Sequence, residues 1–420
     1  MSQRQAAAGV LFEPGSIGPI EVRNRIVRAG TSETMAGPGG EVTDELVSLY
    51  ETLARNEVGL IFTGHLYCHP RGRYALRQTG IYSDELVPGL RRLVEAVQRH
   101  GARIFGQVAH AGSQPRIPDN EPLAPSPVPN QLTGRDVGEA TEEEIEEAID
   151  AFATGARRAV EGGFDGVHIH GANGYLISEF SSPLTNQRTD RFGGSAEARD
   201  NFALEVVRRV RTTVPASLAV TMKIGFVDAV PESTGLELAE SVRRAGRLVA
   251  AGLDAVEVSC NAMRKASDSA GVYVAVDRRR ALADLLVHRV LAGPKPEAYF
   301  RPWAQALRRE VETKVVLVGG MRRVGTMENI LASGDADFVA LARPFIREPD
   351  LVRRLAAGRE EQVECVSCNL CLLHEGHHSL RCWRVPRRRL LEHARYRFSG
   401  ALNRSPGTLR GGRPGSSSPR

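Results

Sequence analysis

The chain has 420 residues, of which 42% are hydrophobic, 25% charged and 5% aromatic, with a formal net charge of +5. This composition is typical of a globular protein, and it excludes a mostly disordered chain, a coiled coil and a collagen-like chain. No apolar run approaches the ~18 residues that a membrane span needs, and the first residues lack the apolar core of a signal peptide. We therefore expect a cytoplasmic protein with no membrane partner.

Eight short apolar, β-branched runs alternate with helix-like segments along the chain. They predict strands at residues 25–31, 59–64, 102–110, 164–170, 218–225, 253–259, 314–320 and 337–342. The helical segments between them begin with capping residues, namely Thr43, Ser83, Thr141, Ser195 and Thr234. This alternation predicts an α/β fold, the (β/α)8 TIM barrel. A doubly wound sheet is the alternative, but no GxGxxG motif follows the first strand.

The positive charge is concentrated at the C-terminal end. The segment from Arg384 to Arg420 has ten arginines and one acidic residue, a net charge of +9, so the rest of the chain carries −4. A nucleic-acid binder would carry a basic face on its fold, so we expect no nucleic-acid partner. We expect three regions, a barrel over 1–358, a Cys-rich extension over 359–390 and a disordered basic tail over 391–420.

In a barrel the active site lies at the C-terminal ends of the strands. The fourth predicted strand ends in His170, followed by Asn173 and Tyr175. A His/Asn pair supplies two hydrogen-bond donors to one oxygen, and a Tyr hydroxyl can deliver a proton nearby. The seventh and eighth predicted strands end in Gly319-Gly320 and Arg343, which together favour a phosphate site. Taken singly, each of these also fits a structural role, a packed His and Tyr or a tight turn.

Four segments together resemble the old yellow enzyme family of FMN-dependent ene-reductases, at residues 24–33, 106–112, 163–199 and 319–351. The layout is closest to the barrel domain of 2,4-dienoyl-CoA reductase and trimethylamine dehydrogenase. The resemblance implies a (β/α)8 barrel that holds FMN and takes electrons from NAD(P)H. The reduced flavin would then reduce the C=C bond of an α,β-unsaturated carbonyl-type small molecule.

The resemblance also implies roles for individual residues. Tyr175 falls at the position of the proton donor, and His170 and Asn173 fall at the pair that holds the activating oxygen of the substrate. The positions that match the FMN site are Ala29, Ser32, Gly64, Gln107, Lys223, Gly319, Gly320, Ala342 and Arg343. Two residues depart from the family pattern, Gly30 where Pro is usual and Ala342 where Gly is usual.

Four of the six cysteines, Cys365, Cys368, Cys371 and Cys382, have the spacing C-x2-C-x2-C-x10-C. In a cytoplasmic chain this density favours a thiolate metal site over disulfides. The two relatives named above carry a 4Fe–4S cluster after the barrel, so iron–sulfur stands ahead of zinc, and unoccupied thiols are a third interpretation. The nearby His374, His377 and His378 are interpreted as a solvated polar loop.

Three other functions stay open at this point. The first is an amine or alcohol dehydrogenase that passes electrons to a partner through a Cys-bound metal cluster. The second is a barrel that has lost catalysis, which the joint presence of the site residues disfavours, and the third is an Arg-tail nucleic-acid binder. Because relatives are often dimers or larger, a homo-oligomer is also expected.

Overall fold

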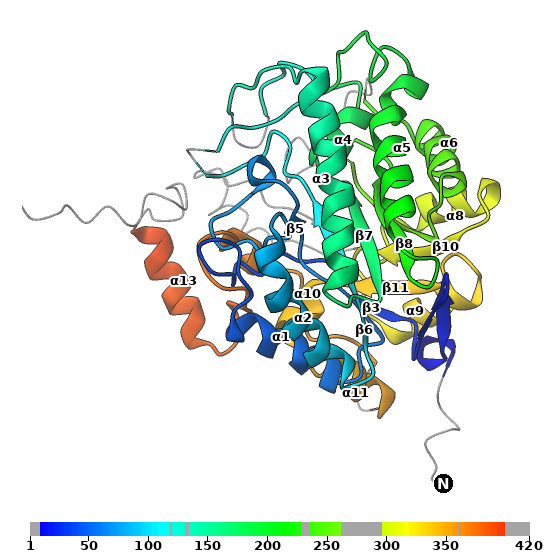
Figure 1. Cartoon of the computed structure of the whole chain (residues 1–420). Coiled ribbons are helices and arrows are strands. Elements are labelled where there is room, and N and C mark those ends of the chain that lie inside the picture. The colour runs from blue at the N-terminus through cyan, green and yellow to red at the C-terminus, as the bar shows by residue number, and fades with distance from the viewer. Residues whose placement is uncertain are drawn as a thin grey trace, which may run out of the picture.

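A computed structural model describes residues 9–117, 120–130, 134–228, 235–261, 296–358 and 361–399 (Figure 1). Eight parallel strands form a closed barrel, because β4 pairs with both β3 and β6. The strands are β3 (Ile26–Arg28), β4 (Leu60–Phe62), β6 (Arg103–Ala109), β7 (Gly166–Gly171), β8 (Ala219–Gly225), β9 (Ala255–Ser259), β10 (Lys314–Val318) and β11 (Phe338–Leu341). The predicted TIM barrel is therefore confirmed, and the doubly wound alternative is wrong.

Helices follow the strands and cover the barrel. They are α1 (Asp44–Arg55), α2 (Val87–Gln98), α3 (Glu142–Glu161), α5 (Ala196–Thr213), α6 (Leu238–Ala250), α8 (Arg301–Glu310) and α9 (Val324–Ala332). Figure 1 shows α3, α5 and α6 side by side on one flank. The predicted caps Thr43, Thr141 and Ser195 each accept a backbone N–H at the start of their helix. The predicted cap Thr234 lies outside the described residues, and α6 begins after Glu237.

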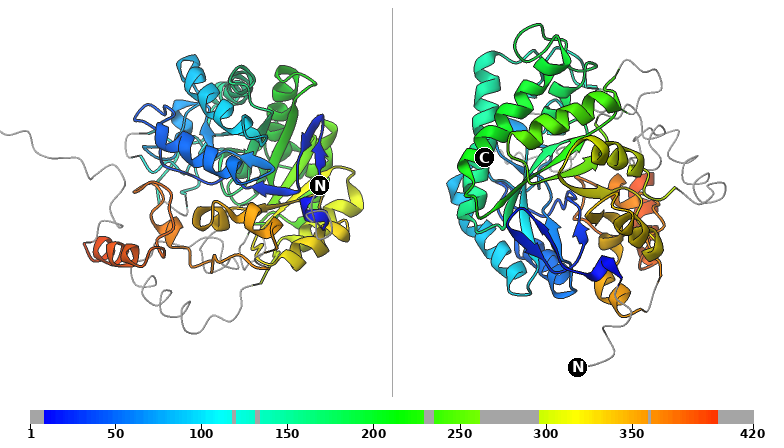
Figure 2. Two further views of the ribbon diagram at one scale, coloured as in Figure 1. Left: turned by 90° about the horizontal axis from the view of Figure 1, so that it is seen from below. Right: turned by 90° about the vertical axis from the view of Figure 1, so that its right-hand side faces the viewer.

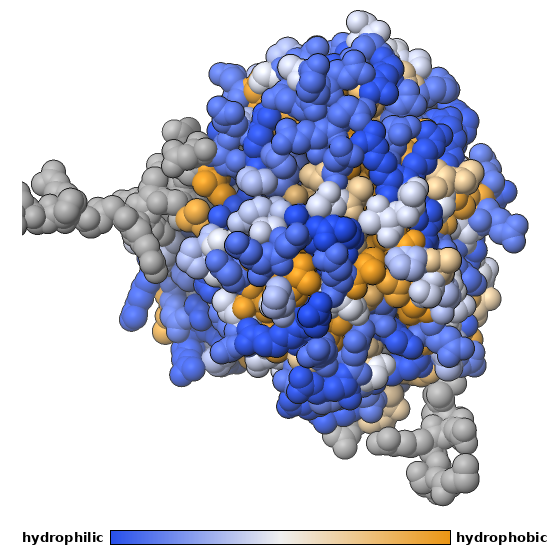
Figure 3. Space-filling model, in the orientation of Figure 1, coloured by the Kyte–Doolittle hydropathy of each residue, from blue (hydrophilic) through white to orange (hydrophobic). Residues whose placement is uncertain are grey.

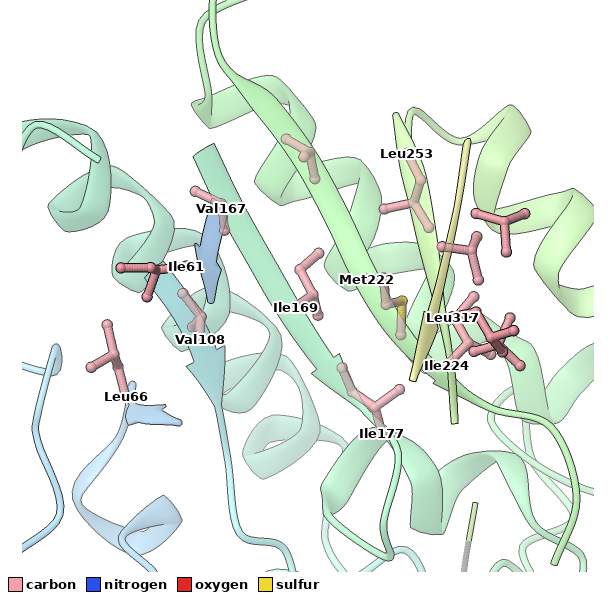
Figure 4. Packing of buried hydrophobic residues seen from close by; sticks show 14 of the residues in the cluster. Ile61, Leu66, Val108, Val167, Ile169, Ile177, Met222, Ile224, Leu253 and Leu317 are labelled. Carbon is pink, nitrogen blue, oxygen red and sulfur yellow. The ribbon is translucent and has the colours of Figure 1, made fainter. Parts of the chain in front are cut away.

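Alternation along the strands separates an outer layer from the barrel interior. Val167, Ile169, Met222 and Ile224 belong to the large cluster between strands and helices, which Figure 4 shows from close by. The residues between them on β7 and β8 belong to the opposite face. The apolar residues of that inner face form a second cluster, with Phe62, Phe105, Ala219, Ala255, Val316 and Phe338 among its members. Inward positions near the C-terminal strand ends are polar, and these supply the site.

An N-terminal hairpin that the sequence analysis did not predict lies beside the barrel. It consists of the antiparallel strands β1 (Gly15–Ile17) and β2 (Ile20–Val22), drawn in dark blue in Figures 1 and 2. Its residues Ile17, Ile20 and Val22 belong to the interior cluster of the barrel. The hairpin thus contributes apolar side chains to the barrel interior.

After the barrel the chain forms short helices, α10 (Arg343–Arg347), α11 (Leu351–Ala356) and α12 (Leu370–Leu373), and then α13 (Arg388–Phe398). Figures 1 and 2 show α13 at the edge of the molecule. The expectation of a disordered tail from residue 391 is wrong for residues 391–398. The physical reason is that α13 buries His393 against His374 in the Cys-rich extension. Residues 400–420 lie outside the described residues.

The face seen in Figure 3 is mostly hydrophilic, with apolar groups scattered between. Within the described part of the chain, the large apolar side chains that are exposed are Leu76, Val366, Val385 and Leu391. None of the helices described is both long enough and apolar enough to cross a membrane.

Candidate active site

The register of neighbouring strands places three polar residues side by side. Two of them were predicted as site residues from the sequence, and the third was not. His170 on β7 is the partner of Lys223 on β8, and Lys223 is the partner of Glu257 on β9. All three are buried, and all lie at inward positions of the barrel. The C-terminal ends of these strands therefore meet in one polar site, as the barrel prediction required.

His170 is held as a neutral hydrogen-bond donor. Its Nδ1 accepts the backbone N–H of Ala172 at 3.4 Å, so the proton of the neutral ring resides on Nε2. Burial, assisted by the nearby Lys223 charge, holds the pKa of His170 well below its usual value. Its Nε2–H can therefore donate to a substrate oxygen without carrying a positive charge.

Asn173 lies on the turn after β7, in the left-handed region at φ +62°. Its backbone N–H donates to the carbonyl of Cys260 at 3.0 Å, and the Ser259 hydroxyl donates to its Oδ1 at 3.1 Å. Because Oδ1 is held by Ser259, the amide orientation is fixed with Nδ2 as the donor atom. The predicted His170–Asn173 pair thus consists of two oriented donors.

Tyr175 packs against the His170 ring, with the ring centroids 4.7 Å apart. Its hydroxyl is 3.5 Å from Nε2 of His65, at the end of β4. Gln78 Nε2 donates to His65 Nδ1 at 2.6 Å, which fixes the His65 proton on Nε2. Burial lowers the pKa of His65, so this ring is a neutral donor toward the Tyr175 oxygen. The structure therefore brings Tyr175 and His170 together and adds His65, Gln78 and Tyr74 around them.

Lys223 is paired with Glu257, which the sequence analysis missed. Lys223 Nζ lies 2.6 Å from Oε1 of Glu257, and Oε2 of that carboxylate lies 2.9 Å from Nε2 of His168. One signal in the sequence could have indicated this pair. Glu257 is a lone charged residue inside the apolar run AVEVS, and a charge buried in a strand requires a partner. The same reasoning applies to Lys223 in the run VTMKIG.

The resemblance also places flavin positions at the ends of the first three predicted strands, which are β3, β4 and β6 in the structure. Gln107 is buried, and its Nε2 has no hydrogen-bond partner among the residues described. A Cβ on Gly30 would lie 2.6 Å from this amide, so Gly30 lets the two segments approach closely. Gly64 donates to Glu33 Oε1 at 2.9 Å, and a Cβ there would overlap Glu33. Ala29 is buried, whereas Ser32 is half-buried.

We expect Gln107→Leu to separate stability from cofactor binding. In the FMN-free protein the variant removes a buried donor that has no partner within the described part of the chain, so the free energy of unfolding should rise by about 1 kcal/mol. FMN affinity should fall about tenfold, because the variant loses one hydrogen bond to the cofactor that contributes about 1.4 kcal/mol. Urea unfolding and FMN fluorescence titration measure the two effects. The matched control is Gln78→Leu, whose amide is bonded to His65, so that variant should lose stability. A destabilised Gln107→Leu protein would contradict this account.

Gly319 and Gly320 have φ of +118° and +74°, which favours glycine at both positions. A Cβ on either would lie within 3 Å of the Tyr299 ring. Ala342 precedes α10, and Arg343, its first residue, donates to Asn369 Oδ1 in the Cys-rich extension. Of the predicted phosphate-binding residues, Arg343 therefore contacts a segment of the extension, which was not predicted from the sequence.

These residues fit FMN by their chemistry. Among the described residues the buried Gln107 amide nitrogen has no hydrogen-bond partner, and this group, the Lys223 cation and the Gly319–Gly320 turn would suit the ring and the phosphate. The profile of the NADH:flavin oxidoreductase / NADH oxidase family matches residues 10–362. The chain belongs to this family. The expected resemblance to the old yellow enzyme family of FMN-dependent oxidoreductases is thereby confirmed.

Known proteins resemble the chain in sequence and in fold. The chain is 36% identical over 370 residues to a metal reductase of Desulforamulus reducens, covering 87% of this chain and 52% of that protein, so it spans about half the length of that relative. It is 38% identical to an NADPH dehydrogenase of Geobacillus sp., covering 81% of this chain and 92% of that protein. The old yellow enzyme homologue of Zymomonas mobilis superposes with a TM-score of 0.68 at 25% identity, covering 85% of this chain and 95% of that one.

In the Cys-rich extension, Cys371 lies near enough to Cys365, Cys368 and Cys382 for their charges to interact. Burial and the neighbouring Cys365 and Cys368 raise the pKa of Cys371 to about 12. Among the residues that the structure describes, no three His, Cys, Asp or Glu side chains are arranged to hold a metal ion. The interpretation of the nearby histidines as a solvated loop is wrong for His374, which is 1% exposed and stacks on Trp383 at 3.5 Å.

His110, which directly follows β6, is expected to make the free energy of unfolding sensitive to acid. It is 1% exposed, its Nδ1 accepts the Gly112 N–H, and burial lowers its pKa to about 3. Because the unfolded chain takes up the proton first, stability is complete above pH 6.5 and is lost as the pH falls toward 3. His110→Asn keeps an acceptor for the Gly112 N–H. We expect it to reduce the slope of the free energy of unfolding against pH, between pH 6 and 4, by up to about 1.4 kcal/mol per pH unit. Urea melts at three pH values measure the slope, and equal slopes would contradict this assignment.

Proposed function

We propose that this protein uses NAD(P)H to reduce the C=C bond of an activated small molecule, such as an α,β-unsaturated ketone. The observation that carries the proposal is the contact of Tyr175 with His170, beside the oriented amide of Asn173. Two neutral donors next to a hydroxyl that carries a transferable proton suit a carbonyl oxygen that gains negative charge while the adjacent carbon takes a proton.

FMN, held by Gln107, Lys223, the Gly319–Gly320 turn and Arg343, would supply the hydride chemistry. His170 Nε2–H and Asn173 Nδ2–H bind the substrate oxygen and orient the double bond. Tyr175 delivers the proton from its hydroxyl to the α-carbon. His65 Nε2–H then stabilises the phenolate by a hydrogen bond, until a solvent proton restores the hydroxyl.

The test is the visible spectrum of the purified protein before and after anaerobic NADPH or NADH, followed by 2-cyclohexenone. We expect a flavin band near ~450 nm that bleaches with a reduced nicotinamide and returns with the enone. A protein that cannot be loaded with FMN would overturn the proposal. Bleaching without recovery on any activated alkene would overturn the substrate class.

The alternative, an amine or alcohol dehydrogenase, is not favoured, because the NADPH dehydrogenase relative covers most of this chain. For the cofactor of Cys365, Cys368, Cys371 and Cys382 we keep iron–sulfur or zinc as the proposal. Absorbance that survives flavin extraction would support iron–sulfur, and metal analysis measures zinc.

A further inference from the structure

Two opposite charges lie in contact inside the barrel, where the flavin positions meet the substrate positions. Lys223 Nζ is 2.6 Å from Glu257 Oε1, and the two side chains are 6% and 0% exposed. The other oxygen, Oε2, is 2.9 Å from His168 Nε2, and His168 Nδ1 is 2.8 Å from the Thr221 hydroxyl. The His168 ring also stacks on Phe62 at 4.0 Å. The carboxylate is therefore held at both oxygens, with one directed at the lysine.

The charge states of this group follow from its surroundings. Burial alone would raise the pKa of Glu257, but the Lys223 ammonium and the His168 hydrogen bond outweigh it and lower the pKa to about 2. Burial lowers the pKa of His168 and of His170, so both rings are neutral. Lys223 and Glu257 together thus present no net charge.

We propose that Glu257 is a positioning residue that offsets the charge of Lys223 and so sets the reduction potential of FMN. The inference rests on FMN binding, which is part of the proposed function. Reduction adds negative charge to the flavin, and a nearby cation stabilises the reduced form. A carboxylate in contact with that cation weakens this stabilisation strongly, because the site excludes water. Glu257 therefore keeps the potential lower than Lys223 alone would, which makes the reduced flavin a stronger hydride donor.

The experiment measures the midpoint potential of FMN in three variants, by anaerobic equilibration with a reference dye. Glu257→Gln should raise the potential by about 30 mV. This shift corresponds to an increase of about tenfold, relative to the wild type, in the ratio of the affinities for reduced and oxidised FMN. Lys223→Met should lower it, since the unpaired carboxylate then opposes reduction. The double variant K223M/E257Q should return close to the wild-type value.

The double variant leaves no unpaired buried charge, so it carries the test even where a single variant does not fold. Asp200→Asn is the matched control, because Asp200 is equally buried but pairs with Arg247 on α6. An unchanged or lower potential in folded E257Q would overturn the inference, and so would a double variant that matches K223M. Failure of the wild type to take up FMN would appear first, and it would overturn the proposed function together with this inference.

Discussion

Tyr175→Phe is expected to slow enone reduction by roughly 10²–10⁴-fold, because it removes the hydroxyl that we propose as the proton donor. Its ring, 8% exposed and packed on His170 and Tyr74, is kept in the variant. Reduction of the enzyme by NADPH does not use this proton, so that half-reaction should change little. Stopped-flow absorbance of the flavin, with each half-reaction started separately, measures both rates.

Tyr82→Phe is the matched control for this variant. Tyr82 stacks on Tyr67 and donates to the carbonyl of Gly39 at 3.3 Å, apart from the polar strand ends. Both half-reactions should keep wild-type rates in the control. Wild-type enone reduction by Tyr175→Phe would remove Tyr175 as the acid, whereas equal slowing of both half-reactions would indicate a disturbed site.

Asn173→Ala is expected to lower the rate constant for enone reduction by roughly 10²–10³-fold, because one of two donors to the developing oxyanion is lost. Ser259→Ala keeps that donor but removes the hydroxyl that orients it, so we expect a smaller loss, about tenfold. His170→Ala should resemble Asn173→Ala. Steady-state kcat and KM for one enone across the three variants measure these losses.

The pH dependence provides an independent check on this pair. Because burial holds the pKa of His170 well below its usual value, the ring stays neutral near neutral pH, and its loss should not remove an acidic limb from the rate profile there. A limb in that range that disappears in His170→Ala would show that the ring acts as an imidazolium. Equal losses in Ser259→Ala and Asn173→Ala would show that the hydroxyl is as important as the amide.

Much of the fold and the site was predictable from local patterns. Each of the eight apolar runs overlaps a barrel strand, because strands buried on both faces require apolar residues over consecutive positions. The helix starts at Thr43, Thr141 and Ser195 follow from caps that act within one turn of the chain. Family membership was readable from the four matching segments and is confirmed over residues 10–362.

What the sequence by itself determined is the barrel, its strand order and the residue types at the strand ends, since these depend on short-range periodicity and capping. Only the tertiary structure decided the partners. Glu257 meets Lys223 because two strands share a register, Ser259 orients Asn173 from a different strand, and Asn369 of the Cys-rich extension contacts Arg343 at the end of the barrel. Such contacts join residues far apart in the chain, and hydrogen-bonding geometry and charge compensation at those distances leave no periodic signal in the sequence.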